Sequence, residues 1–269
     1  MRFPIVCLFG LFALAVAPAG AQTNAQAHLN YNIYAHGLRV AGLEAGFDLN
    51  SAGYRLNMSY RTVGVIGWLF RGGQDNTVQG VWEHDRPEPR RFFSNGTWLG
   101  QARRTLMDYV AGRPLLRQLV PPNEEERETV PPELLPGTVD SLSAIVELVR
   151  EVAETGKCES QARTFDGRRL VALSAHTVGE EELERTDRSS FSGPALRCDF
   201  EGRMVGGFLH ADAAGDRGRL RHGSAWFAQA VPGGPRLPVR MEFETVWFGD
   251  ATVYMTAAGP GATRTAARD

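Results

Sequence analysis

The residues of this chain that could perform nucleophilic chemistry are few and scattered. Ser141 and Ser143 lie beside Asp140, and six histidines are available as a base. A catalytic serine normally lies on a strained turn of the type G-x-S-x-G, and the sequence lacks that motif. The carboxylate of Asp140 can instead accept hydrogen bonds from the free amides of a helix that begins after it. We therefore expect no serine nucleophile here and interpret Asp140 as a helix N-cap.

Carboxylate pairs and cofactor motifs give equally little indication of a catalytic site. Glu242 and Glu244 are two residues apart, so both project from one face of a strand. They could flank a glycosidic bond only where that face lines a cleft. The sequence has neither a Gly-rich phosphate loop that opens a helix nor a dinucleotide fingerprint. We expect no catalytic residue and no cofactor; an envelope hydrolase with an unrecognised active site is the alternative.

The first residues have the pattern of an export signal. Arg2 precedes an apolar run over residues 5–17, and Pro18 is followed by Ala19-Gly20-Ala21, small residues of the kind that a signal peptidase reads. A transmembrane anchor is the alternative, but the run is shorter than the roughly 20 apolar residues that a span requires. We expect residues 1–21 to be a cleaved signal peptide and residues 22–269 to be a single β-rich periplasmic domain with no transmembrane segment.

Three cysteines occur, of which Cys7 would leave with the signal peptide. Cys158 and Cys198 then form an even pair in an oxidising compartment, which favours one disulfide. The alternatives are two unpaired buried thiols or a zinc site that uses His176 or His210. No C-x-x-C or H-x-x-x-H spacing is present, so we expect no metal site.

The overall charge excludes one class of partner. The formal net charge is -2, with 29 basic and 31 acidic residues. A nucleic-acid-binding domain usually carries a clear excess of basic residues. We therefore expect no nucleic-acid partner.

The elements that must position these residues are mostly strands. From Arg55 to Thr62 apolar and polar side chains alternate without a break, as they do in a strand with one buried face. Similar runs begin near Leu29, Leu43 and Val239, and Gly- and Pro-rich turns separate them. Many short strands at near-regular spacing predict a mainly β fold, an antiparallel β-barrel or half-barrel-like β-spiral.

Two segments depart from the period of two. After Asp140, apolar residues at Leu142, Ile145, Val146, Val149 and Val152 follow a helical spacing, and Gly156 provides a stop. This predicts one amphipathic helix at about 140–154 that packs on the sheet or plugs the barrel mouth. The second segment, residues 65–70, fits either a strand or a helical turn.

The aromatic residues raise the question of what the second face of the sheet does. In Phe92-Phe93, Trp226-Phe227 and Trp247-Phe248, one ring of each pair must point away from the core. That face is either covered by the helix or loops, or is an apolar groove for a ligand. The residues that could face a ligand or form a lid are Ile145, Val149, Trp68, Trp82, Trp98, Trp226 and Trp247.

The segment from Phe165 to Arg169 combines a turn with two cations. Asp166-Gly167 between two β runs predicts a two-residue hairpin turn, because glycine tolerates positive φ. The alternative is that Arg168 and Arg169 bind an anionic headgroup or the carboxylates of a partner.

Several short motifs together resemble a known family. They are the hairpin Gly37–Gly42, the segment with Gly80, Pro89 and Phe92, the helix start at Val139–Ala144 and the turn at residues 165–169. The chain resembles the proteobacterial domain-of-unknown-function family 3108, which consists of exported envelope proteins. It is also similar in layout to the β-spiral envelope-integrity proteins and to the half-barrels of the periplasmic lipoprotein carriers. The resemblance implies a periplasmic barrel or spiral with one helix and implies no catalytic residues.

These observations lead to one expected function. We expect a non-catalytic periplasmic protein that binds a lipid, a lipoprotein or another envelope partner and supports the integrity of the envelope.

Overall fold

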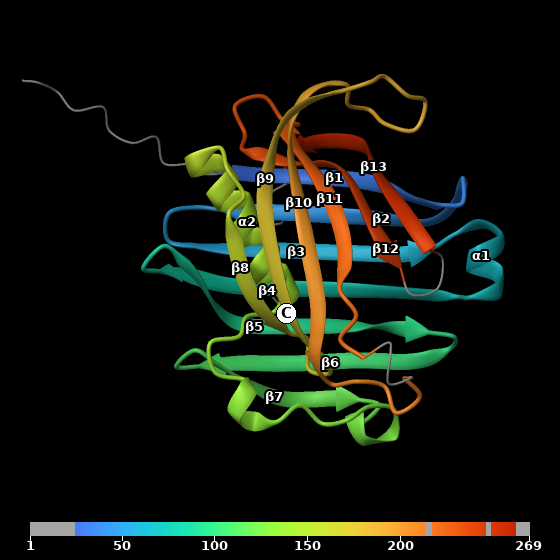
Figure 1. Cartoon of the computed structure of the whole chain (residues 1–269), viewed down its shortest axis with the longest axis vertical. Coiled ribbons are helices and arrows are strands. Elements are labelled where there is room, and N and C mark those ends of the chain that lie inside the picture. The colour runs from blue at the N-terminus through green and yellow to red at the C-terminus, as the bar shows by residue number, and fades with distance from the viewer. Residues whose placement is uncertain (1–24, 213–216, 246–248, 262–269) are drawn as a thin grey trace, which may run out of the picture.

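The computed structural model describes residues 25–212, 217–245 and 249–261 (Figure 1). Within them lie thirteen antiparallel strands of one sheet, in the order β7-β6-β5-β4-β3-β2-β1-β13-β12-β11-β10-β9-β8. The strands are β1 (Ala25–Ala35), β2 (Leu38–Leu49), β3 (Gly53–Thr62), β4 (Gly72–Glu83), β5 (Arg86–Trp98), β6 (Gln101–Val110), β7 (Arg113–Val120), β8 (Ser160–Phe165), β9 (Leu170–Leu183), β10 (Gly193–Gly206), β11 (Arg221–Gln229), β12 (Arg236–Thr245) and β13 (Gly249–Pro260). The predicted signal peptide lies outside the described residues.

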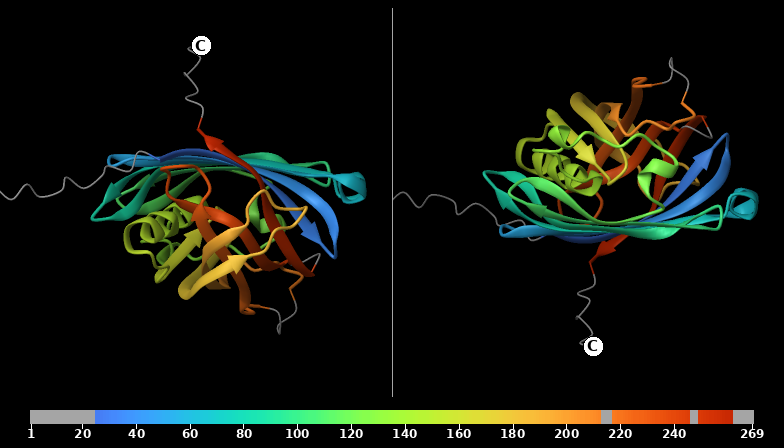
Figure 2. Two further views of the ribbon diagram at one scale, coloured as in Figure 1. Left: turned by 90° about the horizontal axis from the view of Figure 1, so that it is seen from above. Right: turned by 90° about the horizontal axis from the view of Figure 1, so that it is seen from below.

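The sheet curls over on itself, so that β8 to β11 cross the strands of the first half, β1 to β7 (Figures 1 and 2). Hairpins connect β1 to β7 and β8 to β13, and β1 pairs with β13 to join the two halves. The result is a nearly closed antiparallel barrel, which confirms the predicted fold class. The period of two is confirmed as well: Leu43, Ala45, Phe47 and Leu49 of β2 all face the core.

The seam between edge strands β7 and β8 is bridged by the segment that precedes the long helix. This segment contains two short 3-10 helices, Asn123–Glu125 and Pro132–Leu134. Arg127 forms a β-bridge with Leu209, and Val139 forms one with Thr164. Arg103 and Glu126 make a salt bridge with N–O distances of 2.6 Å, which ties β6 to the same segment. The seam is therefore closed by side chains and isolated bridges rather than by a continuous ladder.

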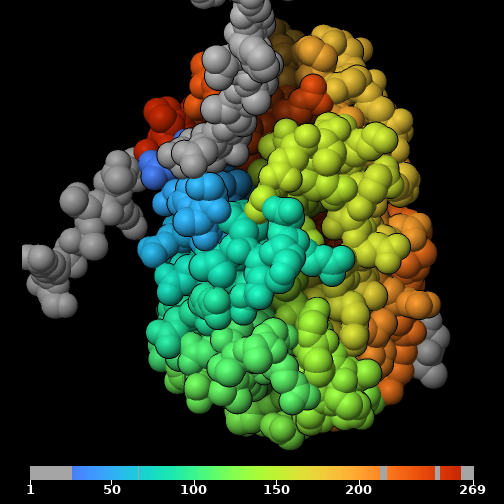
Figure 3. All heavy atoms as spheres, turned by 90° about the vertical axis from the view of Figure 1, so that its left-hand side faces the viewer, coloured from blue at the N-terminus to red at the C-terminus, as the bar shows by residue number. Residues whose placement is uncertain are grey.

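Helix α2 (Ser141–Thr155) lies between the two halves. Its buried apolar residues are Leu142, Val146, Val149 and Val152, which belong to the same core cluster as residues of both halves of the sheet. Ile145 is half-buried and packs against this core. The opposite side of the helix lies at the surface between the halves (Figure 3). The helix thus fills the space between the halves, as the apolar stripe predicted.

The second segment that departs from the period of two, residues 65–70, is also mostly helical. Residues Gly64–Leu69 form the short helix α1, which projects from the end of β3. Within the described residues, no helix has the length and apolarity needed to cross a bilayer.

Asp140 holds the start of α2. Its Oδ1 accepts hydrogen bonds from the amides of Leu142 and Ser143, both at 3.0 Å, and its Oδ2 accepts the Ser143 hydroxyl at 2.6 Å. The Ser143 proton is used in this bond, so Tyr54 of β3 donates its own hydroxyl to Ser143 Oγ at 2.8 Å. Burial raises the pKa of Asp140 to about 6, although these hydrogen bonds oppose the shift. A buried network therefore connects the helix start to the first half of the sheet.

The disulfide joins Cys158, just after α2, to Cys198 in β10. Both residues are fully buried. The bond confirms the predicted pairing and ties the helix exit to the second half of the sheet.

Removal of the disulfide should lower stability without abolishing the fold. The Cys158→Ser, Cys198→Ser double variant frees a loop with a sequence separation of 40 in the unfolded chain. We expect its free energy of unfolding to fall by up to about 4 kcal/mol, measured by urea denaturation. Thiol titration of the unreduced, denatured chain without residues 1–21 should detect no free thiol. Two free thiols and an unchanged stability would contradict the assignment.

The packing of α2 predicts a contrast between its two faces. Val149→Ala should lower the free energy of unfolding by roughly 1–3 kcal/mol, because it removes buried methyl groups and leaves a cavity. Glu154→Ala on the exposed face, which breaks a bond to Arg150, is the matched control and should change it by less than about 0.5 kcal/mol. Thermal and urea unfolding measure both. Equal effects would mean that the helix does not insert between the halves.

Asp140 should make stability depend on pH. Its pKa is higher in the folded chain than in the unfolded chain, so its contribution is greatest below pH 4 and falls as pH rises to about 6. Asp140→Asn keeps an acceptor for the helix amides and removes the titration. The stability of the wild type relative to this variant should therefore be greater at pH 4 than at pH 7, by about 3 kcal/mol at most. The same difference at both pH values would show that Asp140 does not titrate in this range.

Candidate functional site

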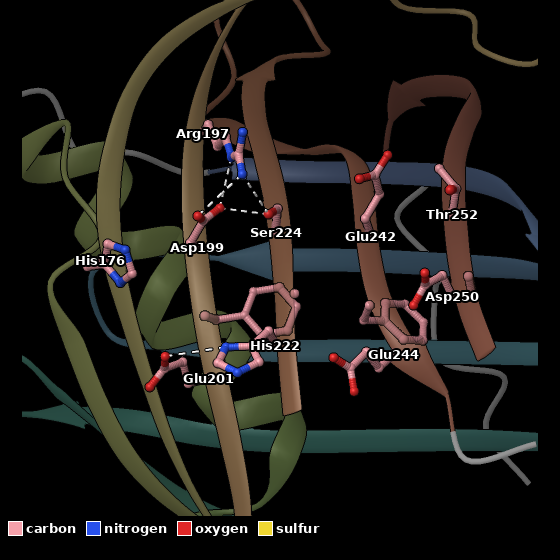
Figure 4. A pocket seen from close by; sticks show the side chains of 14 residues that line it. His176, Arg197, Asp199, Glu201, His222, Ser224, Glu242, Glu244, Asp250 and Thr252 are labelled. Atoms are coloured by element: carbon pink, nitrogen blue, oxygen red, sulfur yellow. Dashed lines mark hydrogen bonds and ion pairs between the residues drawn. The ribbon is translucent and has the colours of Figure 1, made fainter. Parts of the chain in front are cut away.

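A groove of about 490 Å³ crosses the outer face of strands β9 to β13 (Figure 4). Side chains alternate between the two faces of a strand, so the groove residues are interleaved with core residues. In β10, for example, Arg197 and Asp199 line the groove, and Cys198 between them is fully buried. The groove therefore lies on the opposite side of the sheet from α2.

The register of the strands aligns the groove residues in rows. Asp199 pairs with Ser224, Ser224 with Glu242, and Glu242 with Thr252, so one row crosses four strands. Two residues further along, Glu201 pairs with His222, and Glu244 pairs with Asp250. The small side chains of Ser224 and Thr252 leave space between the longer carboxylates.

Arg197 organises one end of the groove. Its guanidinium donates to Asp199 Oδ1 at 2.8 Å and to Glu181 Oε1 at 3.0 Å. Ser224 Oγ donates to Asp199 Oδ1 at 2.6 Å. Partial burial alone would raise the pKa of Asp199, but the hydrogen bonds from Arg197 and Ser224 outweigh it and lower that pKa. Asp199 is therefore a fixed negative charge.

Beside this network, a row of arginines and aromatic rings crosses five strands and one loop. Guanidinium groups lie 5.4 Å and 5.0 Å from the Trp226 ring, 5.5 Å from the Tyr254 ring and 4.6 Å from the Tyr34 ring, and the two tyrosine rings are 5.8 Å apart. The arginine–ring contacts are favourable cation–π interactions, and the two tyrosines form a favourable edge-to-face pair. We call this set the arginine–aromatic ladder; its members in order are Arg197, Trp226, Arg240, Tyr254, Tyr34 and Arg188.

The ladder explains an outward-facing tryptophan. Trp226 lies on the groove side of β11, yet only 5% of it is exposed. Its Nε1 donates to Glu181 Oε2 at 2.7 Å, and two arginines lie over the ring. The second face is here a covered surface and not an open apolar groove.

The groove groups are arranged for binding charge. Ser224 donates to Asp199, whose lowered pKa makes its carboxylate a weak base for the removal of a serine proton. Glu242 and Glu244 do line a groove, which is the condition for a glycosidase pair. However, Glu242 is paired with Arg240, and Glu244 lies 3.7 Å from Arg219. Both carboxylates therefore already have an arginine as a neighbour.

Histidines in the groove do not complete a metal site. His222 lies 3.3 Å from Glu201, and His176 is exposed on β9. In the described part of the chain, no group of three or more histidine, cysteine or acidic side chains is placed to hold a metal ion.

The residues predicted to face a ligand do not come together. Val149 and Ile145 belong to the packing of α2. Trp82 stacks against Tyr54 at 5.0 Å and under Arg150 of α2 at 4.3 Å, and its Nε1 donates to the Asn50 carbonyl. Two other tryptophans are separate from this contact, because Trp98 is half-buried at the end of β5 and Trp68 is exposed on α1. Trp247 lies outside the described residues.

The two arginines of the β8–β9 turn have partners within the chain. The turn is longer than the predicted two residues: residues 166–169 separate the strands, because Asp166 Oδ1 accepts the amides of Arg168 and Arg169. Arg168 donates to the carbonyls of Val120 and Pro121, across the seam. Arg169 forms a salt bridge with Asp166 at 2.7 Å. Both thus have structural roles, and binding of an anionic partner by them stays a prediction.

Sequence reasoning missed most of the groove. Asp199, Ser224 and Thr252 come from three strands, and only the sheet register places them in one row. Polar residues at alternate positions of β10 to β13 were the available signal, and they indicate only a solvated face.

Comparisons with known proteins agree with this architecture. The sequence profile of a family of proteins of unknown function, DUF3108, matches residues 30–256. A crystal structure of a β-barrel-like protein of domain of unknown function DUF1849 from Brucella abortus is similar in fold. The TM-score is 0.53 at 13% sequence identity, with 90% of this chain and 100% of that chain covered. No curated protein matches the chain. The match over most of its length shows that the chain belongs to the DUF3108 family of proteins of unknown function.

Proposed function

We propose that this chain is a non-catalytic binding protein of the bacterial envelope, exported to the periplasm, and that its outer groove binds a basic segment of an envelope protein or lipoprotein. The export pattern of residues 1–21 supports the location, and the Cys158–Cys198 disulfide is typical of an oxidising compartment. A binding role in the envelope would support its integrity by holding such a partner in place.

The observation that carries this proposal is the charge of the groove. Five carboxylates line it and a single arginine, Arg197, is among its lining residues. Two of the carboxylates are the best placed to attract a new cation: Asp250 has no ion pair among the described residues, and Glu244 has only the long contact to Arg219. A groove lined by one sign of charge concentrates ligands of the opposite sign.

The interior supports a lipid ligand less well. The side chains of α2 pack with those of both halves of the sheet in one core cluster, so an acyl chain would have to displace the helix. The groove itself is lined mainly by polar and charged groups, which favour a polar partner over an apolar chain.

A basic peptide tests the groove directly. A dye-labelled peptide of four lysines alternating with serines should bind the wild type, with an affinity that falls as sodium chloride is raised. The Glu244→Gln, Asp250→Asn double variant should bind roughly threefold to tenfold more weakly, by fluorescence anisotropy, because two charges are lost. The Glu125→Gln, Glu133→Gln variant makes the same charge change at two exposed residues outside the groove and is the matched control. Equal affinities of the two variants would refute the groove as the binding site.

The same variants address the hydrolase alternative, which the placement of Glu242 and Glu244 favours. Purified wild-type chain incubated with peptidoglycan fragments should leave them intact. Cleavage that is abolished by Glu244→Gln would show that the groove is an active site and would overturn a purely binding role.

A further inference from the structure

One end of the first half of the sheet exposes an unusual number of apolar side chains. Trp68 is 81% exposed, Val65 71% and Leu38 63%, and Leu69 and Leu99 are more than half exposed. Soluble domains scatter single apolar residues over their surface, but a concentration of large ones usually marks an interaction site. We call these five residues the apolar rim.

The topology brings the rim together from three connections. Leu38 follows the β1–β2 turn, Val65, Trp68 and Leu69 belong to α1 between β3 and β4, and Leu99 lies in the β5–β6 turn. In an antiparallel sheet these three connections fall at the same end, and Figure 1 shows α1 projecting there. Two hydrogen bonds join them: Val63 N to Val40 O at 2.9 Å, and Leu99 N to Arg71 O at 3.0 Å.

Within the three connections that form the rim, the formal charges have one sign. Residues 38–40, 64–71 and 98–101 include two arginines, Arg39 and Arg71, and no acidic residue. Both arginines are exposed, and neither has an ion pair with a described residue. The acidic residue at the start of β4, Asp75, is already paired with Arg61 at 2.7 Å. The rim therefore combines exposed apolar groups, one tryptophan and free positive charge.

We propose that the apolar rim docks on the surface of a phospholipid bilayer that contains anionic lipid. Tryptophan is favoured at the level of the lipid headgroups, where its ring is buried and its indole N–H stays hydrated. Aliphatic side chains of α1 enter the upper acyl region, and Arg39 and Arg71 meet the phosphates. The chain is thereby attached to the membrane surface by the end of its barrel, without crossing it.

A bilayer fits this surface better than a protein partner does. The rim consists of turns and a short helix that project from the molecule, and five side chains expose only a few hundred Å². A stable protein interface usually buries about 800 Å² on each partner. A bilayer needs no complementary shape, so a small projecting apolar group with flanking arginines is sufficient.

The rim and the acidic groove are neighbours. Gly249, which precedes groove residue Asp250, lies against His36 of the β1–β2 turn, so the groove ends beside the rim. A partner in the groove would therefore be held close to the bilayer surface. The docking proposal does not depend on the groove, since the two surfaces share no residue.

Vesicle flotation tests the rim. The probe is vesicles of phosphatidylethanolamine and phosphatidylglycerol. Every variant is expressed as the whole chain with residues 1–21 in place, so the N-terminal residues contribute equally to the vesicle binding of each variant. We expect Trp68→Glu to lower the partition coefficient at least about tenfold, because a charge replaces the interfacial ring. The matched control is Val110→Glu, which changes an exposed apolar residue at the end of β6, beside the β6–β7 turn at the opposite end of the sheet, and should bind as the wild type does.

Charge and groove variants separate the remaining contributions. The Arg39→Gln, Arg71→Gln double variant should bind the anionic vesicles more weakly than the wild type does. On vesicles of phosphatidylcholine alone, the two proteins should bind equally. The Glu244→Gln, Asp250→Asn groove variant should not lose vesicle binding, so that failure of the groove and failure of the rim are told apart. Absence of wild-type binding to vesicles, or an equal loss with Trp68→Glu and Val110→Glu, would overturn the proposal.

Discussion

The structure depends on the insertion of one helix between two halves of a single sheet. A curled sheet of this size has an inner face that must be covered, and α2 covers it with Leu142, Val146, Val149 and Val152. The position of the helix is fixed at both ends. Asp140 and Ser143 connect its start to Tyr54 of the first half, and Cys158 connects the chain after its end to Cys198 of the second half.

This central helix has a consequence for function. Because its apolar face fills the space between the halves, the inner faces of the sheet are used for stability. The proposed binding surfaces are therefore on the outer faces and at the ends of the strands. The acidic groove and the apolar rim are found there, one on the outer face of β9 to β13 and the other at the turns of the first half.

The groove and the rim differ in chemistry and in how they are built. The groove is built on the register of five strands, two of its carboxylates, Asp199 and Glu242, are held by arginines, and the arginine–aromatic ladder supports one side. The rim is formed by short connections whose apolar side chains have few neighbours. A rigid charged surface is suited to a specific partner, whereas exposed apolar turns are suited to an interface that has no fixed shape.

The sequence by itself determined the local structure. Alternation in β2 and β3, the apolar stripe after Asp140, the cap residue and the cysteine pair each depend on neighbours in the chain or on residue type, so a barrel-like sheet, one helix and a disulfide could be predicted. Only the tertiary structure decided which distant residues meet. Three such meetings depend on strand register and on the curl of the sheet. Arg197 and Arg240 cover Trp226, and Arg168 bonds across the seam. Leu38, Trp68 and Leu99 lie at one end of the sheet. The physical reason is that a strand's sequence specifies which of its faces is buried, whereas its partners and their alignment are set by the packing of the whole sheet around α2.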